Sequence, residues 1–134
     1  MKVGFTCSTF DLLHAGHVIM LREAKEQCDY LICGLQVDPS QDRAEKNAPV
    51  QTVVERYTQL KGVEYVDEII PYQTEEEVIQ ILKLKNPTIR IIGEDYIGKD
   101  FTGKDLCNQM GIMIYFNKRK HEISSSRKRF KLKN

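Results

Sequence analysis

Short apolar runs alternate with longer segments of helical periodicity along this 134-residue chain. Runs of four to eight apolar residues bounded by turn-forming residues are typical of buried strands. Such runs predict five strands, the third of them closed by Pro71, at residues 3–7, 30–35, 67–72, 90–93 and 112–116.

The segments between the predicted strands carry apolar residues at helical spacing. Thr74 and Glu77 form a capping box that predicts where the third helix begins. Gly62 and Gly111 each follow a periodic segment and are predicted to end it in the left-handed conformation. The predicted helices run from about 17 to 28, from 52 to 61, from 74 to 84, and through a short segment that ends at Gly111.

Strands that alternate with helices indicate parallel strands joined by right-handed crossovers. The predicted fold is α/β, a Rossmann-like open parallel five-stranded sheet with helices on both faces, in one domain of residues 1–134. Residues 38–49 have no periodicity and are the best candidate for a mobile loop. Ligands of such sheets bind beyond the carboxyl ends of the strands. The segment after the first strand is therefore the candidate site.

That segment reads TFDLLHAGH, with His14 and His17 on either side of Gly16. A glycine lets a ligand approach the backbone, a helix N-terminus offers unpaired N–H groups, and two imidazoles add donors. The pattern predicts an anion-binding turn. RKHEISSS, which contains Arg119 and residues 124–126, offers a second set of donors for phosphate oxygens.

Two other interpretations of the histidine pair remain open. His14 and His17 could face one zinc ion, but zinc needs a third ligand that the neighbouring sequence does not offer. The pair could also be a structural turn whose rings are hydrogen-bonded and inert. We therefore expect no resident metal.

Composition limits the class of protein further. The net charge is +1, and 29% of the residues are charged, as in an ordinary globular protein. Lys and Arg dominate residues 118–134, where Glu122 is the only acid, so that a basic tail of about 127–134 follows an acidic remainder. No aromatic residues alternate with these charges as in a nucleic-acid interface. Four cysteines without a CxxC pair, no signal peptide and no membrane-length apolar run predict a cytoplasmic protein that binds neither membrane nor nucleic acid.

The motif resembles the HxGH signature of the nucleotidylyltransferases. The matching positions are Thr9, Phe10, Asp11, His14, Gly16 and His17. Within that superfamily the chain is most similar to the glycerol-3-phosphate cytidylyltransferases. This similarity extends nearly end to end, through CDYLICG, ERY, YVDEIIPY, GEDYIGKDF and RKHEISSS.

The resemblance implies an enzyme that transfers CMP from CTP to a small phosphorylated polyol or sugar, such as glycerol 3-phosphate, with release of pyrophosphate. It also implies a homodimer, and magnesium carried by the triphosphate. The catalytic residues it implies are His14, His17, Lys46 and Arg119. The nucleotide-binding residues it implies are Thr9, Phe10, Asp11, Gly16, Arg56, Asp95, Ser124, Ser125 and Ser126. Asp11 is expected to orient the turn or a magnesium shell and not to act as a base.

Four departures from the family pattern concern the substrate pockets. Ser8 and Glu122 stand where the family has glycine, Glu64 stands where it has arginine, and residues 74–78 lack the expected lysine. Carboxylates beside the acceptor would favour a substrate richer in hydroxyl groups than glycerol 3-phosphate. In the alternative, Glu64 faces solvent and another cation, Arg43 or Lys99, supplies the missing charge.

The sequence is also compatible with three rival functions. The first is an adenylyltransferase of the same superfamily that acts on a cofactor precursor. The second is a nucleotide-binding domain without turnover, and the third is a nucleic-acid binder that uses the basic tail.

Overall fold

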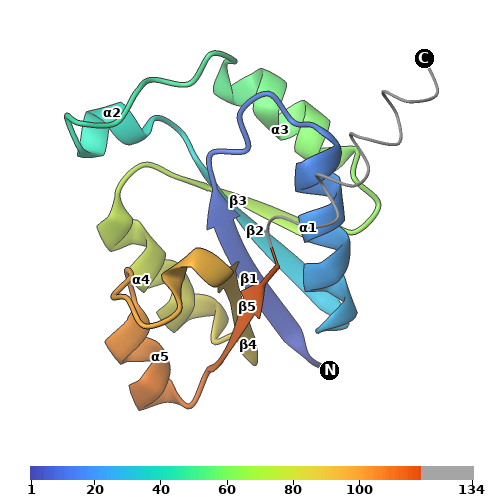
Figure 1. The fold of residues 1–134 in the computed structure, drawn as a ribbon, viewed down its shortest axis with the longest axis vertical. Coiled ribbons are helices and arrows are strands. Elements are labelled where there is room, and N and C mark those ends of the chain that lie inside the picture. Colours follow the sequence, from blue (N-terminus) through green and yellow to red (C-terminus); the bar gives the residue numbers. More distant parts are fainter. Residues whose placement is uncertain (119–134) are drawn as a thin grey trace.

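The structure, a computed structural model, describes residues 1–118 as a sheet covered by helices (Figure 1). The sheet is parallel throughout, with the order β3-β2-β1-β4-β5. Order and direction confirm the predicted Rossmann-like sheet. The strands are β1 (Val3–Ser8), β2 (Tyr30–Gln36), β3 (Glu68–Tyr72), β4 (Ile89–Gly93) and β5 (Met113–Asn117).

Helices cover both faces of the sheet, as predicted (Figure 1). One core cluster joins α1 and α3 to one face through residues such as Leu21 and Leu60. The other cluster joins α4 and α5 to the opposite face through residues such as Leu82 and Cys107. The helices are α1 (Ala15–Glu26), α2 (Pro39–Asp42), α3 (Val53–Lys61), α4 (Glu75–Lys85) and α5 (Lys104–Met110), with a 3-10 turn η1 (Glu94–Tyr96). None of the helices within residues 1–118 has the length and apolar character needed to cross a membrane.

Local sequence signals explain most of the helix boundaries. The predicted capping box is present at the start of α4, where Thr74 and Glu77 bond each other's backbone N–H groups. Gly111 ends α5 with φ 72°, in the left-handed conformation predicted for it. The same prediction for Gly62 is wrong, because Gly62 has φ −78° and remains right-handed. Its N–H still bonds the last turn of α3, so this helix ends without a left-handed residue.

Two segments differ in detail from their prediction. Residues 38–49 contain the short helix α2, which Asp38 caps by accepting the N–H of Ser40 at 3.0 Å. Strand β3 continues through Pro71 to Tyr72 instead of closing at the proline. It can do so because β3 is an outer strand of the sheet, where a missing N–H need not break a ladder.

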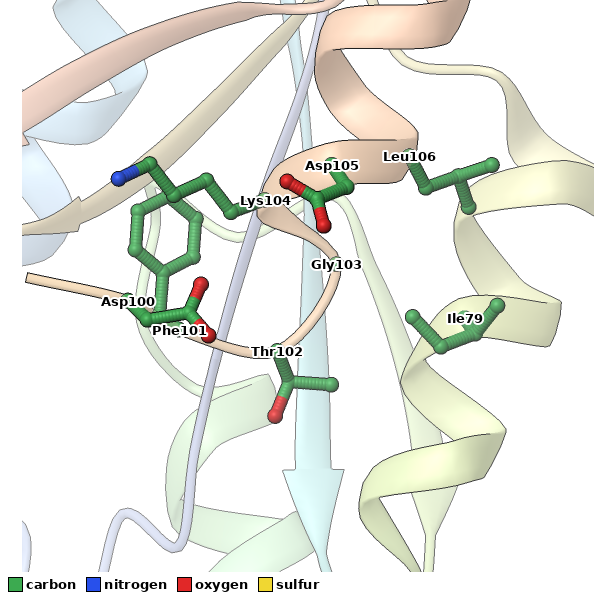
Figure 2. A pocket seen from close by; sticks show the side chains of 8 residues that line it. All are labelled: Ile79, Asp100, Phe101, Thr102, Gly103, Lys104, Asp105 and Leu106. Carbon is green, nitrogen blue, oxygen red and sulfur yellow. The ribbon is translucent and has the colours of Figure 1, made fainter.

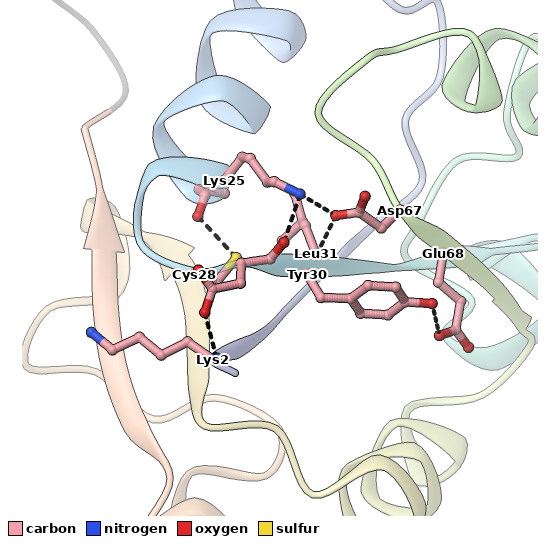
Figure 3. Close-up of polar contacts among 9 residues, drawn as sticks. Lys2, Lys25, Cys28, Tyr30, Leu31, Asp67 and Glu68 are labelled. Atoms are coloured by element: carbon pink, nitrogen blue, oxygen red, sulfur yellow. Dashed lines mark hydrogen bonds and ion pairs between the residues drawn. The ribbon is translucent and has the colours of Figure 1, made fainter.

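Polar contacts tie the strands together at the amino end of the sheet (Figure 3). Lys25 of α1 pairs with Asp67, and the same carboxylate accepts the N–H of Leu31 at 2.8 Å. The Tyr30 hydroxyl donates to Glu68 at 2.8 Å. These contacts fix α1 and β3 against β2 at the end of the sheet opposite to the candidate site.

Strands β1 and β4 separate toward their carboxyl ends. Their pairing covers only Gly4 with Ile89 and Phe5 with Arg90. By contrast, β1 stays paired with β2 as far as Ser8, and β4 stays paired with β5 as far as Gly93. The strand order reverses between β1 and β4, which is where sheets of this class bind ligands. The fold therefore opens a crevice at its switch point.

Candidate functional site

His14 and His17 cap the first turn of α1 together. The Nδ1 atom of His14 accepts the N–H of Gly16 at 2.9 Å, and Nδ1 of His17 accepts the N–H of His14 at 3.1 Å. A nitrogen that accepts a hydrogen bond carries no proton, so each neutral ring carries its proton on Nε2. The ring centroids lie 4.2 Å apart. The turn thus presents two imidazole N–H donors beside a helix N-terminus, an arrangement suited to phosphate.

The turn that leads to the histidines has an unusual backbone. Phe10 and Leu12 adopt φ values of 50° and 51°, in the left-handed region that non-glycine residues rarely enter. The Phe10 side chain is buried, and its ring lies 6.2 Å from the ring of His17. Such a backbone costs about 1–3 kcal/mol per residue and persists only where surrounding contacts enforce it.

Those contacts come from the segment that precedes α3. The Asp11 carboxylate accepts the N–H groups of Val50 at 2.8 Å and Gln51 at 3.0 Å, and Gln51 Oε1 accepts the N–H of Leu12 at 2.8 Å. Burial raises the Asp11 pKa, but the two backbone N–H bonds and the charge of Arg56 outweigh it, so the pKa lies below its ordinary value. Asp11 therefore holds the turn as an ionised carboxylate.

Arg56 of α3 lies beneath the turn, with 2% of its surface exposed. Its guanidinium donates to the carbonyl oxygens of Thr9 at 3.0 Å, Gln36 at 2.6 Å and Gln51 at 3.2 Å, and also to that of Val37. Burial lowers the pKa of Arg56 from its ordinary value. This side chain, expected to bind nucleotide, joins the ends of β1 and β2 to α3 and does not line the cavity described next.

A cavity of about 380 Å³ occupies the crevice at the carboxyl ends of the strands. That volume suits a small molecule. Residues from four strands line it: Thr6 to Ser8 end β1 and Thr9 follows it, Gln36 ends β2, Tyr72 ends β3, and Arg90 to Gly93 belong to β4. Of the expected site residues, Thr9 and Lys46 line the cavity.

Exposed basic side chains line the cavity beside a carboxylate. Arg43 and Lys46 line it and are exposed to solvent, whereas Lys99 is not among the lining residues. Glu75 at the start of α4 also lines the cavity and pairs with Arg43 at 3.8 Å. Glu64 precedes β3 and so lies at the amino end of the sheet, away from the cavity. Glu64 therefore does not border this cavity, whereas Arg43 and Lys46 do.

The other expected site residues do not line the cavity or lie outside the described residues. Asp95 lies in η1, just after β4. Gly16 is buried in the first turn of α1, where its N–H bonds His14. Arg119, Ser124, Ser125 and Ser126 lie outside the described residues.

The structure adds residues that the sequence analysis did not single out. Tyr72 and Gln36 are buried and line the cavity, and Arg90 lies on its floor with 3% exposure. Arg90 was detectable in principle, because it is the one charged residue in the apolar run IRIIG. Charged side chains are seldom buried without a partner or a function.

The fold and the histidine turn define a nucleotidyltransferase of the Rossmann-like α/β class. Residues 5–130 match the family described as cytidylyltransferase-like, and the chain belongs to that family.

Curated relatives agree with this assignment over most of the chain. The bifunctional protein HldE of Caulobacter vibrioides is 39% identical over 97 residues, which are 72% of this chain. HldE of Bradyrhizobium sp. is 38% identical over the same length. The matched part is 20% of each relative, so the chain spans about a fifth of their length.

Solved structures with lower identity share the fold. A lipopolysaccharide core biosynthesis protein from Thermoplasma volcanium superposes with a TM-score of 0.70 at 24% identity, covering 90% of this chain and 97% of that one. A pantoate-beta-alanine ligase from Francisella tularensis gives a TM-score of 0.59 at 18% identity, covering 87% and 59% respectively.

Proposed function

We propose that this protein is a cytidylyltransferase that transfers CMP from CTP to a small phosphorylated polyol or sugar. The family match over residues 5–130 supports nucleotidyl transfer as the reaction. The similarity to glycerol-3-phosphate cytidylyltransferases supports CTP as the donor. Glycerol 3-phosphate or a related compound is the proposed acceptor, and Mg²⁺ enters with the triphosphate as part of that substrate.

The observation that carries the proposal is the orientation of the two imidazoles. Backbone N–H groups occupy Nδ1 of both His14 and His17, which leaves the proton of each neutral ring on Nε2. His14 caps α1 and His17 lies in its first turn, after the loop that leaves the carboxyl end of β1; neither lines the cavity, which this loop borders through Thr9. Donors fixed in this way can bind phosphate oxygens without reorganising during the reaction.

The chemistry needs positioning and charge stabilisation more than it needs a base. An oxygen of the acceptor phosphate forms a bond to the α-phosphorus, the bond from that phosphorus to the bridging oxygen breaks, and pyrophosphate leaves with the electron pair. His14 and His17 would hold the triphosphate, and Lys46 would neutralise charge on the phosphates. The acceptor phosphate is already ionised at neutral pH, so Asp11 need not remove a proton.

Arg43 and Lys46 support a phosphorylated acceptor. Both are exposed at the mouth of the cavity, where a phosphate group could reach them from solvent. Glu75 lies beside Arg43 and can accept hydrogen bonds from acceptor hydroxyl groups. We therefore propose that glycerol 3-phosphate need not be the best acceptor.

Pyrophosphate release tests the proposal. CTP and ATP are each supplied with Mg²⁺ across a panel of phosphorylated polyols and sugars, and the mass of the nucleotide-linked product is measured. Release with CTP and formation of a CDP-linked product support the proposal. Release with ATP alone would identify an adenylyltransferase. Thermal stabilisation by nucleotide without release under any condition would indicate a binding domain without turnover.

A further inference from the structure

Arg90 is a buried cation without a carboxylate partner in the described part of the chain. The residue is 3% exposed, and its guanidinium donates from Nη1 to the carbonyl of Thr102. Among residues 1–118, Nη2 has only a 4.0 Å hydrogen-bond contact to Cys7 Sγ, and Nε has no hydrogen-bond partner. No carboxylate oxygen within residues 1–118 lies at ion-pair distance from this side chain. A buried charge left in this state is costly unless a ligand neutralises it.

The strand geometry places Arg90 on the floor of the cavity. Pairing between β1 and β4 stops at Phe5 and Arg90, and the cavity begins where the strands separate. The Phe101 ring lies 5.0 Å from the Arg90 guanidinium carbon and covers the guanidinium on one side. Arg90 therefore lies deep in the cavity, while Arg43 and Lys46 are exposed at its mouth.

A thin segment of chain forms one wall beside Arg90. Residues 100–102 line the cavity and also line a second hollow of about 470 Å³, which Ile79 and residues 103–106 complete (Figure 2). The carbonyl of Thr102 in this segment accepts the bond from Nη1. This bond fixes the end of the guanidinium that faces the segment, so Nη2, with its long contact to Cys7, and the unpaired Nε are the groups left to meet a ligand.

We propose that Arg90 binds a second anionic group of the acceptor, a carboxylate or a second phosphate, at the floor of this cavity. The inference rests on the proposed function, since it describes the substrate of the same site. The phosphate that attacks CTP lies near Arg43 and Lys46, and the second anion enters the crevice toward Nη2 of Arg90. A phosphorylated hydroxy acid or a sugar bisphosphate has this pattern of charges.

Matched pairs of acceptors test the inference with CTP saturating. D-3-Phosphoglycerate differs from sn-glycerol 3-phosphate by a carboxylate in place of a hydroxymethyl group, and fructose 1,6-bisphosphate differs from fructose 6-phosphate by a second phosphate. We expect one of the two doubly anionic acceptors to exceed its neutral-ended partner at least tenfold in kcat/KM. A charge-assisted hydrogen bond commonly produces a difference of this size. Which pair responds identifies the anion.

Substitutions at the cavity floor show whether Arg90 causes the preference. Arg90→Gln should lower kcat/KM for the favoured acceptor at least tenfold. For the neutral-ended partner, kcat/KM should stay within threefold of the wild-type value. Cys7→Asp keeps Arg90 but places a carboxylate beside Nη2, and it should abolish the same preference in a folded protein. Lys83→Gln, on the exposed side of α4, removes one positive charge away from the cavity and serves as the control.

Three results would overturn the inference. The first is that neither doubly anionic acceptor exceeds its partner tenfold in kcat/KM. The second is that Arg90→Gln lowers kcat/KM equally for both members of a pair. The third comes from a measurement that needs no turnover. Without nucleotide, the favoured acceptor should raise the Tm of the wild type more than that of Arg90→Gln, and equal shifts would reject the anion site. If no acceptor is converted with either nucleotide, the proposed function fails, and this thermal comparison, run with all four compounds, still decides the role of Arg90.

Discussion

His17 accepts the backbone N–H of His14 at 3.1 Å, while the side chain of His14 accepts the N–H of Gly16 at 2.9 Å. The two residues therefore form a capping box made of imidazoles, in positions where other helices use hydroxyl and carboxyl groups. One consequence is that the structural and chemical roles of each ring are divided between its two nitrogens. Substitutions of His17 separate these roles.

His17→Ala is expected to lower turnover by about a hundredfold to a thousandfold, the usual loss for a donor that stabilises developing charge. It also removes the cap and should cost about 0.5–2 kcal/mol of the free energy of unfolding. His17→Gln keeps an acceptor suited to the capping box and should restore stability without restoring turnover. Urea unfolding and pyrophosphate release measure the two effects. Near-normal turnover in either variant would mean that the imidazole has only a structural role.

Asp11→Ala should lower stability at pH 7 by about 1–2 kcal/mol, because Val50 and Gln51 lose the acceptor of their N–H bonds. The folded pKa of Asp11 lies below its ordinary value, so its stabilising effect is complete above the unfolded pKa of about 4. It is lost as pH falls through the folded pKa. The difference between wild type and variant should therefore shrink from pH 5 to pH 2 in urea titrations. A constant difference over that range would contradict the ionised role of Asp11.

Arg56→Lys is expected to destabilise the fold by about 3 kcal/mol although it keeps the charge. A lysine cannot reach the four carbonyl oxygens that the planar guanidinium serves, and buried acceptors left unpaired cost about 1–3 kcal/mol each. Arg43→Lys, at an exposed arginine, should change stability by less than about 0.5 kcal/mol. Urea midpoints for both variants make the comparison. Equal midpoints would show that Arg56 is not a structural arginine.

Gly103→Ala should destabilise the protein and disturb Arg90. Gly103 has φ 85°, and an added Cβ would lie 2.7 Å from Leu82 Cδ1 and 2.9 Å from Arg90 Nη1. Gly98→Ala is the control, because Gly98 has φ 76° but open space around the added Cβ. Both variants should lose about 1 kcal/mol through backbone strain, and only Gly103→Ala should lose more through crowding. Equal decreases in Tm for Gly103→Ala and Gly98→Ala would show that the added Cβ does not crowd Arg90.

The strands were predictable to within one or two residues because each is an apolar run, and burial on both faces requires such a run in a parallel sheet. Gly111 and the capping box of Thr74 were predictable for a similar reason, since each acts through its immediate neighbours. Gly62 was not, because a helix can end on a right-handed glycine and the sequence does not distinguish the two conformations.

The candidate site was predictable only in part. The histidine turn follows from a local motif, and its position follows from the rule for switch points. The roles of Arg56 and Arg90 depend on carbonyls and strands that meet from distant parts of the chain. Four carbonyl oxygens accept hydrogen bonds from Arg56, whereas Nε of Arg90 has no hydrogen-bond partner among the described residues. No local sequence signal separates these two cases.

Pro71 also affects how this sheet meets other molecules. The Tyr72 carbonyl faces inward and accepts the N–H of Val37 at 2.7 Å, so the adjacent position, Pro71, directs its nitrogen away from β2. An incoming strand would find no donor at Pro71, the fourth residue of an edge only five residues long. Pro71, which β3 tolerates as an outer strand, therefore disfavours edge-to-edge association of two sheets along β3.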